Sequence, residues 1–340
     1  MNLYINELKE NEVITSFNFA RNSDYVFSEI ITKDKFDLLE NKNSLYKISE
    51  TENHILYVNS EIKIKENDVI FCNTYFIKDL FAKIENIGNL KNLKLITNQT
   101  DHSITKELFK LKPTCISEWY SININFNSPD LIPIPLGLSN ENEKNLNKKH
   151  FSKLKENKNK IYKIYINFQK NTNYIKRNKH IKKFKNKTFI HIDEPNLQLD
   201  VYAEKLNSYK FILCPVGNGI DTHRVWESLY AGSVPIVQKH ISMSTLENLN
   251  AIQIDDFSNI DFKLIDNYSP KKENNKKLTI EFWTNKIRNN KLKSDEFFSI
   301  KLTNEDLNEF KKNYFQIQRK ESNFKKIKTL QRKLYSKLGF

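Results

Sequence analysis

Residues Phe211 to Val237 read FILCPVGNGIDTHRVWESLYAGSVPIV, and this stretch carries the signals of a complete strand-turn-helix-strand unit. Residues 210–214 predict a buried strand, residues 215–221 a glycine-rich turn and residues 222–231 a helix. Gly232 ends that helix at the C′ position, and residues 234–237 predict the next strand. This rhythm is typical of an α/β fold with a parallel sheet.

The glycine turn before the predicted helix is typical of an anion site. Gly217 and Gly219 allow the backbone to approach a phosphate closely, and the N–H groups of residues 219–222 would face it with the positive end of the helix dipole. A tight turn that needs positive φ explains the two glycines equally well.

Two side chains on the predicted helix strengthen the phosphate interpretation. Arg224 and Glu227 are three residues apart and share one helix face. A guanidinium pairs with a pyrophosphate through two parallel hydrogen bonds, and a carboxylate one turn later suits a pair of ribose hydroxyls. An ordinary intrahelical ion pair is the alternative. Thr222 stands where a dinucleotide-binding motif has its third glycine, and the chain contains no P-loop sequence.

The rest of the chain extends this α/β pattern in both directions. Strands are predicted at 68–72 and 93–97 with a helix at 75–87 between them. After a polar Lys/Asn-rich stretch at 140–160, a second alternation begins with a strand at 161–168. It continues with a helix near 174–185, a strand at 188–192, a helix near 198–207 and a strand at 209–214. We therefore predict domains at 1–150 and 151–303, followed by a helical tail at 304–340.

Composition and charge limit the classes of protein. Apolar residues make up 39% and aromatic residues 12% of the 340 residues, which excludes wholesale disorder. The net charge of +14 is concentrated in residues 151–200, with 13 basic and 4 acidic side chains, and in residues 301–340, with 11 and 4. This clustering predicts attraction to phosphates, and compositional drift toward Lys, Asn and Ile is the alternative.

Compartment signals are few. Three scattered cysteines predict neither a disulfide framework nor a closed zinc site and fit a reducing compartment. The polar N-terminus predicts no signal peptide, and no apolar run approaches the ~20 residues of a membrane span. The expected localisation is cytoplasmic, either soluble or peripheral on the inner face of a membrane.

The stretch at 211–237 resembles the donor-binding signature of exostosin-like glycosyltransferases of the bacterial and viral type. The resemblance lies in Gly-Asn-Gly at 217–219, His-Arg-x-x-Glu at 223–227 and Gly-x-x-Pro at 232–235. Weaker similarities occur at 95–104, at 132–138 and at 165–173 with Arg177, so the resemblance covers roughly residues 65–240.

This resemblance implies a GT-B architecture, in which two Rossmann-like parallel-sheet domains face each other across a cleft. It also implies a hexosyl- or pentosyltransferase that uses a nucleoside-diphosphate sugar as donor substrate, without a further cofactor, and a glycan or lipid-linked glycan as acceptor in polysaccharide synthesis. Val216 stands where relatives often carry a charged side chain, so one donor contact is missing. The implied donor-binding residues are Asn171, Thr172, Arg177, Gly217, Asn218, Gly219, Asp221, Thr222, His223, Arg224 and Glu227.

The implied reaction leaves negative charge on the departing diphosphate. Arg224 and the helix start would stabilise this charge, and His223 would touch the phosphates or else lie on the helix surface. The chain has no Asp-x-Asp triplet, so we expect no metal site and an inverting, metal-independent transfer. Such a transfer needs a general base, for which we predict Asp101 with His102 beside it, at a strand end. The alternative role of Asp101 is to cap a helix that starts near Ile104.

The C-terminal tail and two rival functions complete the expectations. Residues 319–340 contain eight basic residues and one acidic residue. This pattern predicts either a helix on an anionic membrane surface or a helix packed on the N-terminal domain. The rival functions are a basic nucleic-acid-binding protein, although no recognition motif accompanies the charge and no nucleic-acid partner is expected, and a non-catalytic nucleotide-binding module.

Overall fold

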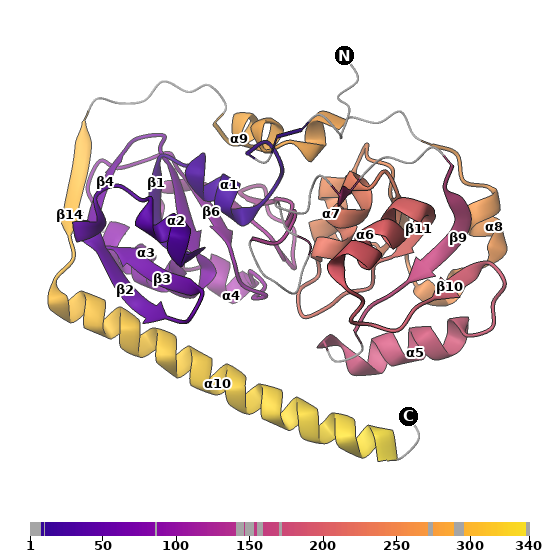
Figure 1. Ribbon diagram of the computed structural model, residues 1–340. Helices are drawn as coiled ribbons and strands as arrows, with labels where there is room; N and C mark the ends of the chain where they lie inside the picture. The colour runs from indigo at the N-terminus through magenta and orange to yellow at the C-terminus, as the bar shows by residue number, and fades with distance from the viewer. Residues whose placement is uncertain are drawn as a thin grey trace. The chain divides into compact units, whose positions relative to one another are not determined.

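A computed structural model describes residues 8–9, 11–85, 87–140, 146, 153–154, 159–169, 172–270, 275–288 and 296–337 (Figure 1). The chain divides into two units that are not contiguous in sequence. Unit 1 consists of Met1–Asn22, Asp101–Phe109 and Trp119–Asn290, and unit 2 of Ser23–Thr100, Lys110–Glu118 and Lys291–Phe340. The predicted boundary near residue 150 and the GT-B arrangement stay predictions.

Unit 1 is built around a five-stranded sheet in the order β10-β9-β11-β12-β13, and every neighbouring pair is parallel. The strands are β9 (Ile161–Ile166), β10 (Ile190–Ile192), β11 (Tyr209–Leu213), β12 (Val234–Gln238) and β13 (Ile252–Ile254). The helices of this part are α5 (Tyr174–Phe184), α6 (Leu199–Ser208), α7 (His223–Tyr230), η6 (Ile241–Leu246), η7 (Phe257–Asn259) and α8 (Phe262–Asp266). This is the doubly wound α/β pattern that the alternation of strands and helices predicts.

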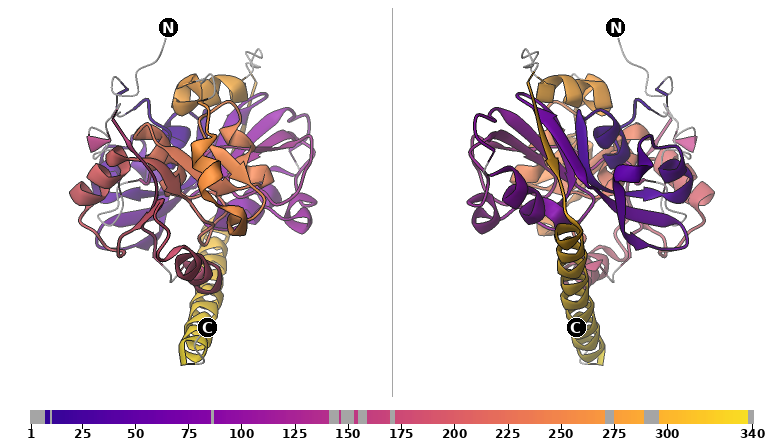
Figure 2. Two further views of the ribbon diagram at one scale, coloured as in Figure 1. Left: turned by 90° about the vertical axis from the view of Figure 1, so that its right-hand side faces the viewer. Right: turned by 90° about the vertical axis from the view of Figure 1, so that its left-hand side faces the viewer.

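Burial on both faces explains why these strands read as continuous apolar runs. Alternate residues of three strands, including Ile164, Phe211 and Ile236, form one core cluster with Phe184 of α5 and Ile265 of α8. Because side chains alternate along a strand, the intervening residues face the opposite side of the sheet. Figure 2 shows helices on both sides of this sheet.

The remaining elements of unit 1 come from both ends of its sequence. They are α1 (Ser16–Arg21), α4 (Lys106–Phe109), β8 (Leu131–Pro133), η8 (Asn275–Leu278) and α9 (Ile280–Arg288). Ile14 and Tyr230 join these segments to the sheet layer, because the Tyr230 hydroxyl accepts the Ile14 N–H at 2.9 Å and donates to the Leu278 carbonyl at 2.7 Å. Gly137 has φ +73°, and a Cβ there would lie 2.1 Å from the Ile14 carbonyl oxygen, so the position requires glycine.

Unit 2 contains a mixed sheet, which corrects the expectation of a wholly parallel one. Its strands β1 (Tyr25–Thr32), β5 (Val69–Asn73) and β6 (Leu93–Asn98) are parallel neighbours, whereas β2 (Leu45–Glu50) and β3 (His54–Asn59) form an antiparallel hairpin that pairs with β1. Only three residues link β2 to β3, and so short a link permits only antiparallel pairing. Strand β7 (Ile116–Ser121) comes next to β6 in the sheet order. Its last three residues belong to unit 1, where they pair with β8.

The other elements of unit 2 include α2 (Lys33–Asp37), η2 (Lys42–Ser44), η3 (Thr74–Phe76), α3 (Ile77–Ile84) and the antiparallel pair β4 (Glu61–Lys65) and β14 (Phe297–Lys301). The chain ends in α10 (Asn304–Lys337), which Figures 1 and 2 show as one uninterrupted helix. Among the described residues, no helix combines the length and the apolar character needed to cross a membrane.

Candidate functional site

A pocket of about 740 Å³ opens in unit 1 at the carboxyl ends of its parallel strands. In the order β10-β9-β11-β12-β13, the chain passes from β9 to β10 on one side and from β11 to β12 on the other, so β9 and β11 flank the topological switch point, where open α/β sheets bind ligands. Residues that follow β9, β10 and β11 supply the wall. They are Asn167, Gln169, Thr172 and Arg177, then Pro195 to Leu199 with Tyr202, and finally Thr222, His223, Arg224 and Glu227, with Leu146 completing the lining.

Helix α7 begins at this pocket with an unusual cap. Thr222 has the extended conformation of an N-cap residue, with φ −131° and ψ 147°, but its hydroxyl makes no capping hydrogen bond. A threonine at this position normally accepts an N–H of the first turn. The Val225 N–H donates to the Thr222 carbonyl at 3.0 Å, whereas the Thr222 hydroxyl is left for another partner.

Three buried polar atoms without a hydrogen-bond partner among the described residues belong to residues of this pocket wall. They are Thr172 Oγ1, Thr222 Oγ1 and Arg224 Nη1. A buried donor or acceptor that stays unsatisfied costs about 1–3 kcal/mol. Their concentration at one pocket is what a site built for a polar, anionic ligand requires, because the ligand's oxygens would replace the missing partners.

Arg224, Tyr202 and Glu227 form a connected group in the pocket wall. The guanidinium carbon of Arg224 lies 5.1 Å from the centroid of the Tyr202 ring, and the Tyr202 hydroxyl donates to Glu227 Oε2 at 2.8 Å. Burial opposes the charge of Arg224, but the neighbouring Tyr202 and Glu227 outweigh it and raise the pKa of Arg224. Burial also raises the pKa of Glu227, against the opposing effects of Arg224 and the Tyr202 hydroxyl.

Arg177, which also lines the pocket, holds the turn in place. Its guanidinium donates to three backbone carbonyls, those of Gln169 at 2.9 Å, Pro215 at 3.1 Å and Val216 at 3.1 Å. Burial and the proximity of Arg224 lower the pKa of Arg177 to about 10. Arg177 therefore ties the segment after β9 to the segment after β11, the two sides of the switch point.

The sequence predicts that the backbone N–H groups of the glycine turn face a phosphate, but two of them have an acceptor within the protein. The N–H groups of Ile220 and Asp221 both donate to Asn123 Oδ1, at 2.8 and 3.2 Å. The Gly217 N–H donates to the Gly219 carbonyl at 3.0 Å. A Cβ at Gly219 would lie 2.8 Å from Asn123 Nδ2, so the glycine admits the asparagine side chain rather than a phosphate.

Asp221 occupies a structural position next to this turn. Its carboxylate accepts the Leu136 N–H at 2.9 Å and the indole N–H of Trp226 at 2.9 and 3.1 Å. Burial raises the pKa of Asp221 to about 6, although these donors act to lower it. In the described part of the chain, Asp221 does not line the pocket, and neither do Gly217, Gly219 and the exposed Asn218.

His223 lines the pocket, and one of its ring nitrogens is hydrogen-bonded. Its Nδ1 lies 2.8 Å from the Gly137 carbonyl oxygen. A carbonyl oxygen only accepts, so Nδ1 carries a proton and donates it to Gly137. The imidazole thus presents Nε2 as the ring nitrogen available to a ligand.

The remaining predicted site residues lie elsewhere. Asp101 and His102 are exposed residues of unit 1 that follow β6, and they are not part of the described pocket lining. The predicted alternative role of Asp101 as a helix cap is wrong, because Thr105 Oγ1 accepts the Leu108 N–H at 3.3 Å and caps α4. Asn171 lies outside the described residues.

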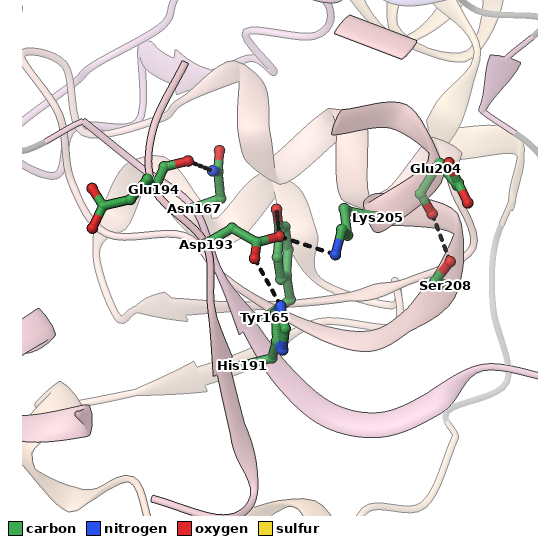
Figure 3. A network of polar contacts seen from close by, with 8 residues as sticks. All are labelled: Tyr165, Asn167, His191, Asp193, Glu194, Glu204, Lys205 and Ser208. Atoms are coloured by element: carbon green, nitrogen blue, oxygen red, sulfur yellow. Dashed lines mark hydrogen bonds and ion pairs between the residues drawn. The ribbon is translucent and has the colours of Figure 1, made fainter. Parts of the chain in front are cut away.

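A second polar network lies at the ends of β9 and β10 and includes Asn167 of the pocket wall (Figure 3). Asp193 accepts hydrogen bonds from Tyr165 at 3.1 Å and His191 at 2.8 Å, and pairs with Lys205 at 3.2 Å. Burial opposes its charge, but these partners lower the pKa of Asp193. Asn167, which lines the pocket, donates to the Glu194 carbonyl at 2.6 Å.

Tyr202 and Asn123 are site residues that the sequence analysis missed. Tyr202 lies in the predicted helix at 198–207, where its apolar ring reads as an ordinary core position. Asn123 lies 98 residues before Asp221, and no local pattern connects the two positions. Among the described residues, no cluster of three or more His, Cys, Asp or Glu side chains is arranged to hold a metal ion.

Comparison with known proteins agrees with the position of this pocket. Residues 158–268, which include β9 to β13 and the pocket residues from Asn167 to Glu227, match the family model of the RXYLT1 C-terminal domain. No curated protein matches the chain. The family match points to a glycosyltransferase-type domain at the part of the chain that carries the pocket.

Proposed function

We propose that the protein transfers a sugar from a nucleoside-diphosphate sugar to a hydroxyl of a glycan acceptor, and that the pocket of unit 1 binds the donor. One observation carries this proposal. Thr172, Thr222 and Arg224 each have a buried side-chain atom without a partner among the described residues, and all three residues line one pocket at the switch point. Its volume of about 740 Å³ is in the range of small-molecule sites.

Within this proposal the diphosphate lies against the start of α7. Arg224 Nη1 and the Thr222 hydroxyl donate to phosphate oxygens, and the helix dipole favours the negative charge. Stacking on Tyr202 holds the guanidinium in place. Glu227 binds ribose hydroxyls through its second carboxylate oxygen, since Oε2 already accepts from Tyr202.

The proposed transfer inverts the anomeric centre. The acceptor hydroxyl oxygen attacks the anomeric carbon while the bond from that carbon to the diphosphate oxygen breaks, and the electron pair leaves on the diphosphate. Arg224 and the helix start stabilise this charge as it develops, so the step needs no metal. Asp101 accepts the proton of the acceptor hydroxyl as the general base, with His102 beside it.

We also propose that the transferred sugar is a hexose or a pentose and that the product belongs to polysaccharide synthesis. The cytoplasm is the proposed compartment, since Cys72, Cys115 and Cys214 are free, buried thiols.

The test is a thermal-shift series with UDP, GDP, CDP and their sugars, in the presence of EDTA. A ligand at 100 times its Kd stabilises the folded state by about 2.7 kcal/mol. The nucleotide whose nucleobase the pocket accepts should therefore raise the melting temperature clearly. Arg224→Lys should reduce the shift by at least about half. If no nucleotide raises the melting temperature at millimolar concentration, the donor pocket is refuted. Salt-sensitive binding to DNA or RNA in place of nucleotide binding would favour the rival function.

A further inference from the structure

Helix α10 (Asn304–Lys337) is fixed to unit 2 by its first half only. Leu307 and Phe310 are buried, and the Tyr314 ring stacks on Phe76 with centroids 5.9 Å apart. Lys83 pairs with Asp306 at 2.6 Å. Among the described residues, the last side-chain bond from α10 to the rest of unit 2 joins Glu321 to the Tyr75 hydroxyl, at 3.1 Å.

The second half of the helix has a different environment. We call residues 322–333 of α10 the distal segment. Between Ser322 and Gln331 every side chain is exposed except that of Thr329, which is half-buried. Phe324, Ile327 and Leu330 are 56%, 52% and 62% exposed, which is unusual for three large apolar residues on one short stretch. Figure 1 shows the distal segment extending away from the sheet of unit 2.

These three apolar residues form one stripe along the helix. Their spacing of three residues places them within an arc of about 120°, at about 100° per residue. Lys326 and Lys328 lie about 100° to either side of Ile327, Lys333 lies on the same flank as Lys326, and Lys325 lies on the opposite side. The distal segment is therefore apolar on one face and cationic on its flanks and back.

We infer that the distal segment docks on the surface of an anionic lipid bilayer. The apolar stripe would enter the boundary between headgroups and acyl chains, and the flanking lysines would reach the lipid phosphates. A nucleic acid would satisfy the lysines but leave Phe324, Ile327 and Leu330 in water. A bilayer complements both features of the segment at once.

The experiment is co-sedimentation of the full chain with vesicles of phosphatidylcholine alone or of phosphatidylcholine mixed with phosphatidylglycerol. We expect binding to the mixed vesicles, at least about tenfold tighter than to the neutral ones. Raising the salt from about 0.1 M to about 1 M shortens the Debye length from about 10 Å to about 3 Å and should weaken binding strongly.

Two variants separate the two faces. Substitution of Phe324, Ile327 and Leu330 by serine should weaken binding to mixed vesicles by at least about tenfold, because the stripe is lost. Substitution of Lys325, Lys326 and Lys328 by glutamine should weaken it by about 100-fold. The matched charge control replaces the exposed Lys91, Lys110 and Lys185 by glutamine and should leave binding unchanged.

Several results would overturn the inference. One is equal binding to neutral and mixed vesicles. Another is that the serine variant sediments with vesicles like the unchanged chain. A third is a concentration-dependent dimer that the serine variant abolishes without any vesicle binding, because the stripe would then cover a second copy. The vesicle assay contains no nucleotide, so its failure and the failure of the donor pocket are independent.

Discussion

The guanidinium carbon of Arg224 lies 5.1 Å from the centre of the Tyr202 ring, and Arg224 Nη1 is buried without a partner among the described residues. The ring lies against the guanidinium, while the unpaired nitrogen keeps part of its hydrogen-bonding capacity unused. This combination is pre-organisation for a ligand, because the cost of ordering and desolvating the side chain is borne before the ligand arrives.

Arg224→Lys should weaken nucleoside-diphosphate binding by about 10- to 100-fold, since a charge-assisted hydrogen bond is worth about 1.5–3 kcal/mol and an ammonium cannot stack flat on Tyr202. Thr222→Val should reduce the affinity less, because it removes one neutral donor. Isothermal titration calorimetry measures both effects. Arg288→Lys, on α9, is the matched control with unchanged affinity. Full affinity in Arg224→Lys would contradict the proposed role.

Arg177→Lys should lower the free energy of unfolding. A lysine cannot replace three hydrogen bonds to the carbonyls of Gln169, Pro215 and Val216, so we expect a loss of about 2–4 kcal/mol in unfolding free energy. Chemical denaturation measures this loss. Arg224→Lys should cost much less stability, because its Nη1 makes no bond to lose. Equal stability losses in the two variants would argue against the separation of a holding arginine from a binding arginine.

Gly219→Ala should destabilise the turn by about 1–3 kcal/mol. The added methyl group would lie 2.8 Å from Asn123 Nδ2 and displace the side chain that accepts the N–H groups of Ile220 and Asp221. The control is Gly88→Ala, because a Cβ at Gly88 has no neighbour within 4 Å. We expect thermal melting of the two variants to differ by several degrees. Similar melting temperatures would contradict this account of the turn.

The raised pKa of Asp221 predicts how the free energy of unfolding changes with pH. Its pKa is raised from 3.8 to about 6, so the folded state binds the proton more tightly than the unfolded state. Its contribution to stability is therefore complete below the unfolded pKa and is lost as the pH rises through about 6. The difference in unfolding free energy between the unchanged chain and Asp221→Asn should shrink over this range.

Asp193→Asn provides a control of opposite sign for that measurement. The pKa of Asp193 is lowered, so its contribution is present above the unfolded pKa and is lost as the pH falls. Urea denaturation at several pH values gives both difference curves. Curves with the same sign for Asp193 and Asp221 would refute the assigned protonation states.

Asp101→Asn tests the proposed general base. The variant should lose sugar transfer by at least about 100-fold while keeping donor affinity, because proton transfer by a positioned base contributes about 100- to 10,000-fold. Transfer assays and calorimetry on the same preparation separate the two effects. Asp130→Asn, at another exposed aspartate of unit 1, should keep full activity. Unchanged turnover in Asp101→Asn would remove this residue from the mechanism.

Short-range patterns were sufficient for the central elements of unit 1. Apolar runs, the glycine turn and the helix-ending Gly232 predict both ends of β11, α7 and β12 to within one residue. These signals depend only on neighbours along the chain. The same patterns predict β9, α5 and α6. They also place Arg224 and Glu227 on one helix face, since positions three residues apart are neighbours on a helix surface whatever surrounds them.

Long-range packing decided what those residues do. The side chain of Asn123 accepts a hydrogen bond from the glycine turn in place of a ligand. Arg177, from another segment, donates a hydrogen bond to the backbone of the turn. The pairing of the β2–β3 hairpin with β1 also depends on contacts between segments that no local pattern specifies. Hydrogen bonds between distant segments depend on which surfaces meet in the folded chain. The sequence therefore indicates where a site forms, while packing determines which of its polar groups remain free for a ligand.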